Sequence, residues 1–410
     1  MKYIVVVGDG MADRPLKQLS GKTPLEAAHK THMDYIARNG RCGLLRTLSE
    51  DAPLGSDIAN LSLLGYDPKK YHPGGRGPLE AAAMKVPLGE GDIAFRVNLV
   101  TEEKGLLKDY SGGHISSREG GELIRAVDAA FGSERINFYP GVGYRHLAVL
   151  RKPGVDYRDI IAMPPHDILG RKVQGNLIRA GSKDARHVVD ELNRIMKASK
   201  EILGSHKVNV KRLGENKDPA NMIWLWGGGK KPDMPKFREM FGLSGALISA
   251  VDLLRGIGAC IGLEVIDVPG ATGYFDTDYD KKAEYALAAL KRKDFVYLHV
   301  EAPDEASHEG NIEEKIRAIE AIDEKILGRI LGELEGSDFR LAVLPDHATP
   351  IEVKTHTAEP VPFAIYSAGE KGDGLACYSE KEAAKGSYGL REGVELMGLL
   401  IDKKANKTKS

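Results

Sequence analysis

The sequence predicts an α/β protein, with a mainly parallel sheet flanked by helices and a second domain inserted into it. The runs at residues 2–7, 295–300 and 339–344 are apolar and contain many β-branched residues, which is typical of strands buried on both faces. Amphipathic patterns at residues 281–293 and 311–334 predict helices that alternate with the two later strands. Strands that alternate with helices indicate a parallel sheet covered on both sides.

A helix is also expected soon after the first strand, at residues 23–39. Thr23 and Glu26 match a capping box, in which each side chain bonds to the backbone of the other residue. Pro24 stands at the first helical position, where its missing N–H costs nothing. Gly40 then predicts the end of this helix.

The remaining elements are predicted from local composition and periodicity. Residues 41–80 are rich in glycine, proline and aspartate, and we expect mostly loop there, with a short helix after Ser56. Elsewhere the patterns predict strand segments within 92–101 and 135–151 and at 262–268, helices at 118–131, 182–203 and 246–261, and a junction or binding loop at 224–232.

These patterns divide the chain into two domains. Strands alternate with helices near both ends of the chain, whereas the middle of the chain does not show this pattern. We therefore predict a core domain of residues 1–79 and 236–402 and an inserted α/β or α+β domain of residues 80–235. Residues 403–410 form a polar tail that is expected to be disordered.

Composition excludes several classes of function. The 58 basic and 59 acidic residues give a net charge of −1, so there is no electrostatic argument for nucleic acid or an anionic membrane as a partner. No stretch approaches the ~20 apolar residues that span a bilayer. The three cysteines lie far apart, and an odd number argues against a disulfide framework. We expect a soluble cytoplasmic protein.

Three acidic residues follow predicted strands and are candidate metal ligands. Asp9 and Asp346 come directly after the first and last of the apolar runs, and Asp304 follows the middle one after a short turn. Because ligands bind beyond the carboxyl ends of parallel strands, the three carboxylates are expected to converge. His308 lies four residues after Asp304, so a helical turn places both on one face.

Two more histidines complete the candidate metal site. His347 directly follows the last acidic residue, and His356 comes nine residues later. A mixture of carboxylate and imidazole suits Zn, Mn, Co or Fe better than Ca or Mg. Each element alone is weak, since an Asp-x-x-x-His pair is more often a solvated helix face. The joint pattern of acids at strand ends with clustered histidines favours a metal centre.

Ser56 is a candidate nucleophile at a predicted helix start. Gly55 permits a tight turn before it, and a helix N-terminus stabilises anions through free N–H groups and the helix dipole. A serine in this position is more often an N-cap. It becomes a nucleophile only if a metal ion lowers the pKa of its hydroxyl.

Three residues in glycine-rich segments are candidates for anion binding. His114 follows Gly112 and Gly113, Arg145 follows a similar turn, and Arg76 lies near the predicted domain junction. Arginine suits bidentate recognition of carboxylate or phosphate, although a surface ion pair is the commoner role. The sequence contains neither a Walker A loop at 227–231 nor a dinucleotide-binding glycine pattern at its first strand.

These residues resemble the alkaline phosphatase superfamily, and within it the cofactor-independent phosphoglycerate mutases of the archaeal type. The most specific segments are residues 8–13 (GDGMAD), 55–68 (GSDIANLSLLGYDP), 301–308 (EAPDEASH) and 345–350 (PDHATP). The resemblance covers almost the whole chain, up to the polar tail. It implies an alkaline-phosphatase-like fold.

The resemblance also implies the ligands of two divalent metal ions, with Mn²⁺ the first choice and Zn²⁺, Co²⁺ or Mg²⁺ as alternatives. No 2,3-bisphosphoglycerate is expected as cofactor. One ion would be held by Asp304, His308 and His356, and the other by Asp9, Asp346, His347 and the oxygen of Ser56. His114 is similar to the family's substrate-site histidine, and Arg145 and Arg171 are predicted substrate arginines.

The implied activity is the interconversion of 3-phosphoglycerate and 2-phosphoglycerate in glycolysis and gluconeogenesis, through a phosphoserine at Ser56. The inserted domain would supply arginines for the substrate carboxylate and act as a lid. A metal-dependent phosphatase or phosphopentomutase of the same superfamily would share every metal ligand and remains an alternative, as does a metal-binding protein without catalysis. Phosphoglycerate is the expected partner, with neither nucleic acid nor membrane, and a homo-oligomer is left open.

Overall fold

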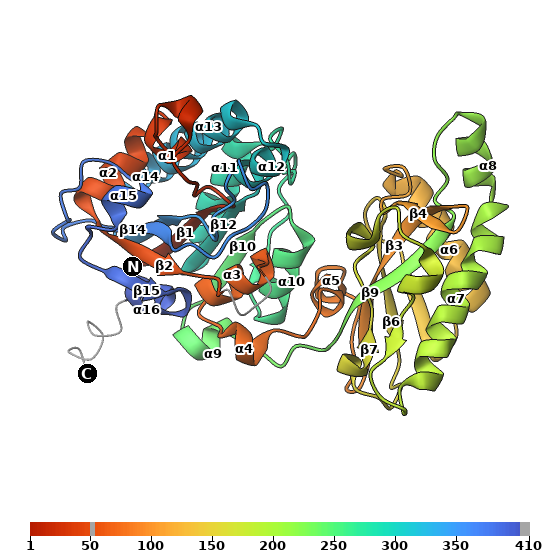
Figure 1. Ribbon diagram of the computed structural model, residues 1–410. Helices are drawn as coiled ribbons and strands as arrows, with labels where there is room; N and C mark the ends of the chain where they lie inside the picture. The colour runs from red at the N-terminus through yellow and green to blue at the C-terminus, as the bar shows by residue number, and fades with distance from the viewer. Residues whose placement is uncertain (50–53, 402–410) are drawn as a thin grey trace. The chain divides into compact units, whose positions relative to one another are not determined.

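The protein is described by a computed structural model at residues 1–49 and 54–401, so the predicted polar tail at 403–410 lies outside the described residues. The chain forms two compact units (Figure 1). Unit 1 comprises Met1–His72 and Met234–Ser410, and unit 2 comprises Pro73–Asp233. Among the described residues, no helix combines the length and the apolar character needed to cross a membrane.

Unit 1 is built on a mixed, mainly parallel sheet of eight strands. Its centre is β1 (Lys2–Gly8), which pairs in parallel with β12 (Phe295–Val300) and β13 (Phe339–Leu344). Beyond β12 lie β10 (Gly245–Ile248) and β11 (Glu264–Val265), also parallel. The three apolar runs are therefore adjacent strands, and the predicted α/β class is confirmed.

The other side of this sheet contains strands that the sequence did not predict. β14 (Val361–Ser367) runs antiparallel to β13 and to β2 (Arg41–Arg46), and β15 (Gly389–Glu392) closes this edge beside β2. The expectation of mostly loop at residues 41–80 was wrong, although the short helix predicted after Ser56 is present at Ser56–Leu63. β2 pairs with segments more than 300 residues away, so nothing near it in the sequence indicates the strand.

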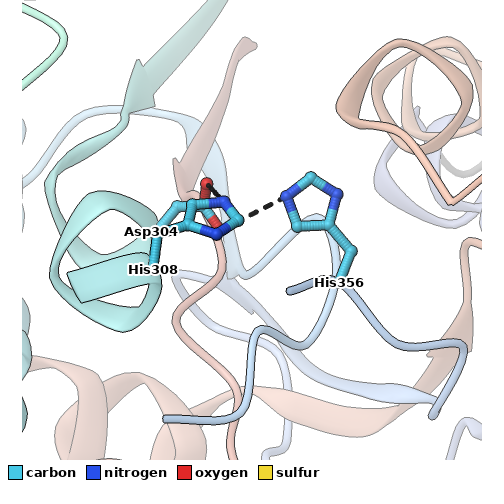
Figure 2. A group of neighbouring side chains, drawn as sticks. All are labelled: Asp304, His308 and His356. Carbon is cyan, nitrogen blue, oxygen red and sulfur yellow. Dashed lines mark ion pairs between the residues drawn. The ribbon is translucent and has the colours of Figure 1, made fainter. Parts of the chain in front are cut away.

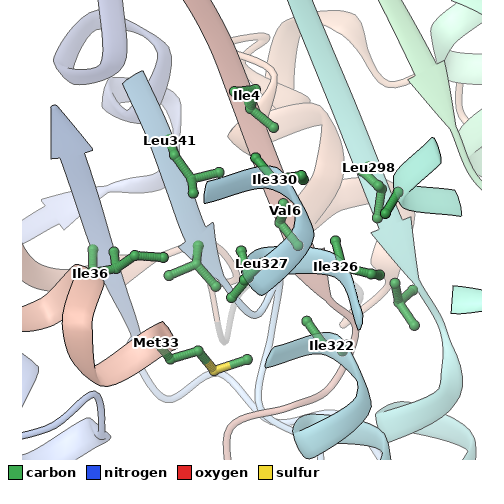
Figure 3. Packing of buried hydrophobic residues seen from close by; sticks show 14 of the residues in the cluster. Ile4, Val6, Met33, Ile36, Leu298, Ile322, Ile326, Leu327, Ile330 and Leu341 are labelled. Atoms are coloured by element: carbon green, nitrogen blue, oxygen red, sulfur yellow. The ribbon is translucent and has the colours of Figure 1, made fainter. Parts of the chain in front are cut away.

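Helices cover the sheet and bury both faces of its central strands. Ile4 and Val6 point to one face, and Val5 to the other, with each fully buried. The predicted helix at 311–334 is observed as α13 (Ile312–Ala321), a π-helical segment (Ile322–Gly328) and α14 (Arg329–Glu333), after an Asn311 N-cap. Figure 3 shows Met33, Ile36, Ile322, Ile326, Leu327 and Ile330 of the helices packed around Ile4, Val6, Leu298 and Leu341 of the strands.

The helix predicted at 23–39 is divided in two. Its capping box is present, but α1 ends at Ala27 and α2 spans Thr31–Asn39. The carboxylate of Asp323 accepts the backbone N–H groups of His32 and Met33, at 3.2 and 2.6 Å. A side chain from elsewhere in the fold thus starts a second helix, which overrides the local pattern.

Two further predictions in the later sequence need correction. Residues 246–261 were expected to form one helix, but Gly245–Ile248 is the strand β10 and only Asp252–Cys260 is helical (α10). The expected loop at 224–232 is β9 (Met222–Lys230). Both strands pair with partners distant in sequence, which decides their conformation.

Unit 2 is an antiparallel sheet with its long helices on one face, while the short helix α5 (Gly77–Ala83) packs on the other face, where Ala81 meets Ala94, Leu147 and Val149. β3 (Ile93–Glu103) lies between β6 (Arg145–Leu150) and β9, and its far end pairs with β4 (Leu106–Asp109). The fifth strand, β5 (Ile136–Tyr139), pairs with β6. The long helices, which the sequence predicted closely, are α6 (Ser117–Phe131) and α7 (Arg186–Gly204).

Candidate metal centre and active site

The candidate site lies at the carboxyl ends of three adjacent strands of unit 1. Asp9 follows β1, Asp346 follows β13, and Asp304 lies in α12 (Ala302–Glu309), which begins directly after β12. Because these strands are parallel neighbours, the three carboxylates meet at one edge of the sheet. All three residues are buried. Gly10, at φ 59°, fits here because a Cβ would lie 2.4 Å from the Oδ1 of Asp304.

The first group of ligands is Asp304, His308 and His356, and it matches the first predicted metal site. His308 Nε2 lies 3.0 Å from Asp304 Oδ2, and His356 Nε2 lies 3.6 Å from Asp304 Oδ1. Figure 2 shows Asp304 and His308 on one helix, with His356 facing them from a separate segment. One ligand atom from each of the three lies within 4.8 Å of the others, which suits a single cation.

Both histidines of this group are held by backbone carbonyls. His308 Nδ1 lies 2.9 Å from the oxygen of Lys354, and His356 Nδ1 lies 3.0 Å from the oxygen of Leu54. A carbonyl only accepts, so each Nδ1 carries the proton and each Nε2 faces Asp304. In the absence of a cation, the hydrogen bond to Asp304 raises the pKa of His308 to about 9.

The second group comprises Asp9, Asp346, His347 and Ser56, whose side chains lie close to one another. His347 Nε2 lies 3.2 Å from Asp9 Oδ1, 3.6 Å from Asp346 Oδ2 and 3.1 Å from Ser56 Oγ. Thr349 donates its hydroxyl to Asp304 at 2.6 Å, so the same oxygen accepts the Nδ1–H of His347 at 3.1 Å. The Nε2 lone pair of His347 therefore points to the place where the carboxylates and the serine converge.

Ser56 is the first residue of α3 (Ser56–Leu63), and its side chain is free of any capping role. The N-cap is Gly55, where a Cβ would lie 2.3 Å from Asp57 Oδ1. The commoner interpretation of Ser56 as an N-cap is therefore wrong. Its hydroxyl faces His347 at the N-terminus of the helix, where free N–H groups favour an anion such as a phosphoryl group.

The charges of this site fit divalent cations. Neither carboxylate oxygen of Asp9 has a hydrogen bond among the described residues, although both are buried, and the same holds for His356 Nε2. Burial, followed by the charge of Asp346, raises the pKa of Asp9 well above its usual value. Burial and the charge of Asp304 likewise raise the pKa of Glu301 to about 8. Buried carboxylates placed so close together are costly unless they are compensated, and bound cations would supply that compensation.

The structure adds residues that the sequence analysis missed. His299 Nε2 lies 3.1 Å from Asp9 Oδ2, and the ring, Asp9 and Asp346 form another group able to hold an ion. Asn60 donates to Asp346 Oδ2 at 2.7 Å and accepts from the hydroxyl of Tyr297 at 2.5 Å. The spacing of Ser56 and Asn60 on one helix face could have indicated Asn60, whereas His299 lies in an apolar run that indicates only a core strand.

The predicted substrate residues all lie in unit 2 and are exposed. His114 is at φ 50°, and its N–H donates to the hydroxyl of Ser111 at 3.1 Å. The Arg145 guanidinium lies 5.6 Å from the ring centre of Tyr144. Arg171 joins β4 through its backbone carbonyl, which accepts from Leu107 at 3.0 Å. Their roles in substrate binding stay predictions.

Comparisons with known proteins point to one family. The family model for 2,3-bisphosphoglycerate-independent phosphoglycerate mutase matches residues 37–209. A mutase of this description from Methanothrix thermoacetophila is 51% identical over 403 residues, which is 98% of this chain and 100% of the relative. A probable mutase of the same kind from Geobacter sulfurreducens is 50% identical over 410 residues, with the same shares covered.

Solved structures agree with these sequence matches. A protein from Pyrococcus horikoshii is 30% identical with a TM-score of 0.83, covering 98% of this chain and 96% of the other. A cofactor-independent phosphoglycerate mutase from Thermoplasma acidophilum is 28% identical with a TM-score of 0.68, covering 98% and 99%. The similarity therefore extends through both units.

Proposed function

Because this chain belongs to the family of 2,3-bisphosphoglycerate-independent phosphoglycerate mutases, we propose that it interconverts 3-phosphoglycerate and 2-phosphoglycerate through a phosphoserine at Ser56. The enzyme is an isomerase of the archaeal type of this family. One observation carries the choice of nucleophile. Ser56 Oγ lies 3.1 Å from His347 Nε2, where the carboxylates of Asp9 and Asp346 also converge.

Two divalent cations are the proposed cofactors, and 2,3-bisphosphoglycerate is not required. Asp304, His308 and His356 would hold one ion, and Asp9, Asp346, His347 and Ser56 the other. When bound, such ions offset the charge of the phosphoryl group and lower the pKa of the serine hydroxyl. Mn²⁺ is the first choice, with Zn²⁺, Co²⁺ and Mg²⁺ as alternatives, because the donors are carboxylates and imidazoles.

The reaction consists of two phosphoryl transfers and needs no other reactant. The oxygen of Ser56 attacks phosphorus, the bond from phosphorus to the C3 oxygen breaks, and that oxygen takes up the proton that the serine loses. The C2 hydroxyl oxygen of glycerate then attacks the phosphorus of the phosphoserine, the bond from phosphorus to Ser56 Oγ breaks, and this oxygen takes up the proton that the C2 hydroxyl loses. Phosphoryl transfer needs mainly positioning and charge stabilisation, which buried and fixed side chains supply.

Neighbouring residues fix the reacting groups. Asn60 bonds to both the backbone oxygen of Ser56 and the carboxylate of Asp346, at 2.8 and 2.7 Å, so it ties the nucleophile to a metal ligand. Thr349 similarly links His347 to Asp304, which joins the two ligand groups. Such bonds reduce the reorganisation needed when charge develops on the phosphoryl oxygens.

The remaining predictions of the sequence belong to this proposal. His114, Arg145 and Arg171 are proposed to bind substrate, and the region of residues 80–235 to serve as the substrate-binding domain and lid. Phosphoglycerate is the proposed small-molecule partner, and the cytoplasm the proposed location. A phosphatase would use the same metal ligands, so the fate of the phosphoryl group distinguishes the two activities.

The proposal is tested with the purified chain, Mn²⁺ and 3-phosphoglycerate. An assay coupled to enolase measures 2-phosphoglycerate, free phosphate is measured in parallel, and mass spectrometry locates the phosphoryl group. We expect phosphate on Ser56 and a loss of roughly 1,000-fold or more in kcat for Ser56→Ala, as for other removed nucleophiles. Ser337→Ala, which changes an exposed serine of unit 1, is the control and should keep full activity. An active Ser56→Ala enzyme contradicts the mechanism, and release of free phosphate in place of 2-phosphoglycerate contradicts the mutase assignment.

A further inference from the structure

A fully buried lysine lies beside the loops that carry the candidate metal ligands. Lys315 is on α13 and has no exposed surface. Ala318 and Ile319, three and four residues later, share the buried face of this helix with it. Removing an ammonium group from water is costly unless charged and polar partners surround it. The partners of Lys315 therefore indicate its role.

Three acceptors surround the ammonium group of Lys315, and they come from two loops. The Nζ atom lies 2.7 Å from Asp13 Oδ2, 3.3 Å from the oxygen of Ala12 and 3.0 Å from the oxygen of Thr349. An ammonium group has three N–H donors, so each donor has an acceptor here. Ala12 and Asp13 belong to the loop after β1, and Thr349 belongs to the loop after β13. Lys315 thus joins the two loops.

Asp13 strengthens this junction from the other side. Its carboxylate accepts the backbone N–H of Arg14 at 2.7 Å and that of Ile351 at 3.1 Å, so it also bonds to both loops. Its own N–H donates to the carboxylate of Glu380 at 3.1 Å. The side chains of Asp13 and Lys315 are both fully buried. Apolar residues of similar volume would fill this space without the cost of removing two charges from water, so stability of the core alone explains the pair poorly.

Thr349 connects the junction to both groups of candidate ligands. Its backbone oxygen accepts from Lys315, while its hydroxyl donates to Asp304 at 2.6 Å and lies 3.1 Å from His347 Nδ1. Asp304 belongs to the first ligand group and His347 to the second. In addition, α13 begins only two residues after the end of α12, the helix that carries Asp304 and His308. All the segments with strand-end carboxylates are therefore linked at Lys315.

We propose that Lys315, together with Asp13, is a positioning residue that fixes the two ligand groups relative to each other and thereby sets the spacing of the two bound cations. This inference rests on the proposed function and deepens it. Lys315 acts without touching substrate or cation. Its bonds order the two loops before the ions bind, so less ordering remains for the binding step. Two cations clamp a phosphoryl group only at a suitable separation, so this spacing also affects kcat.

The test uses the full chain with Mn²⁺ and the variant Lys315→Met, which keeps a long side chain but donates no hydrogen bond. Titration calorimetry measures Mn²⁺ affinity. Electron paramagnetic resonance measures the magnetic coupling between the two ions, which depends steeply on their separation. We expect Lys315→Met to bind Mn²⁺ ~10–100-fold more weakly, the usual effect of losing a residue that supports metal ligands. The coupling should change, and kcat should fall with little change in KM.

A double variant separates positioning from stability. Lys315→Met combined with Asp13→Asn leaves no unpaired buried charge, so it should resist urea better than Lys315→Met alone. It still lacks the bonds from the ammonium group to the two loops, so its affinity and coupling should stay altered. If Lys315→Met does not fold, the double variant carries the test. Lys30→Met is the matched control, because Lys30 is also a buried lysine of unit 1 but pairs with Asp34, four residues away, at 2.9 Å. Its Mn²⁺ affinity, coupling and kcat should match those of the wild type.

Two outcomes would overturn the positioning role of Lys315. Wild-type affinity and coupling in Lys315→Met contradict it directly. Recovery of both properties in the double variant would mean that the ion pair serves stability alone. A wild-type chain that binds two Mn²⁺ ions but lacks mutase activity instead contradicts only the proposed function, because the metal measurements still decide the role of Lys315.

Discussion

At the scale of single residues, the proposed metal centre depends on side chains that are not themselves predicted ligands. Asn60 is fully buried and uses its amide nitrogen for Ser56 and Asp346 and its oxygen for Tyr297. No water can replace these bonds without opening the core. The carboxylate of Asp346, a proposed metal ligand, is therefore positioned by a helix residue one turn beyond Ser56, the proposed nucleophile.

Asn60→Ala should weaken metal binding at the Asp9 group without altering the fold. The change leaves Asp346 Oδ2 without this donor and the Tyr297 hydroxyl without its acceptor. We expect a ~10–100-fold loss of metal affinity, the usual effect of removing such a supporting residue. Titration calorimetry with Mn²⁺ and metal content by mass spectrometry measure it. Asn39→Ala is the matched control, since Asn39 also donates to the carbonyl four residues earlier but lies away from the centre. Equal affinity in Asn60→Ala would disprove the role.

The sequence identifies the candidate metal ligands better than the residues that hold them in place, for a physical reason. Asp9 and Asp346 come directly after apolar strands, and a carboxylate at the end of a buried strand can be recognised in the sequence alone. His299 lies inside a strand where every residue is buried, so its polar contact with Asp9 depends on the neighbouring strand.

At the scale of elements, the start of a helix is decided by contacts from distant residues. Local signals place the capping box at Thr23 and Glu26, and it forms as predicted. The second start, at α2, has no side-chain cap of its own and relies on Asp323 in the π-helical segment. The sequence predicts the end of the helix at Gly40 correctly because that signal is local. It misses the break before α2 because Asp323 lies far away in the sequence.

Asp323→Ala should destabilise unit 1 and loosen the start of α2. Two backbone N–H groups lose their acceptor, and helix caps of this kind contribute ~1–2 kcal/mol. Chemical denaturation followed by circular dichroism gives the change in unfolding free energy, and hydrogen exchange at His32 and Met33 locates it. Glu324→Ala changes the adjacent exposed acid and should stay within about 0.5 kcal/mol of wild type. If both variants were equally stable, tertiary capping would not explain the break.

At the scale of the whole molecule, the predicted metal ligands and the tryptophans lie in different units. Each unit has its own apolar core, one around the eight-stranded sheet and one between the antiparallel sheet and its helices. Every predicted metal ligand belongs to unit 1. The two tryptophans of the chain, Trp224 and Trp226, both lie on β9 of unit 2. Tryptophan fluorescence therefore reports the unfolding of unit 2, whereas circular dichroism reports both units.

This separation predicts how metal removal changes unfolding. A ligand that binds only the folded state stabilises it by ~2.7 kcal/mol when its concentration is 100 times Kd. Mn²⁺ in that excess, compared with a chelator, should raise the midpoint of the circular dichroism transition assigned to unit 1 in urea. The fluorescence midpoint should not move, because the metal ligands lie outside the unit that holds the tryptophans. Asp346→Asn removes a ligand, and its unit 1 midpoint should no longer respond to Mn²⁺. A fluorescence midpoint that shifts together with the circular dichroism midpoint would instead mean that both units unfold as one cooperative structure, since stabilisation of one part is shared only when the whole unfolds together.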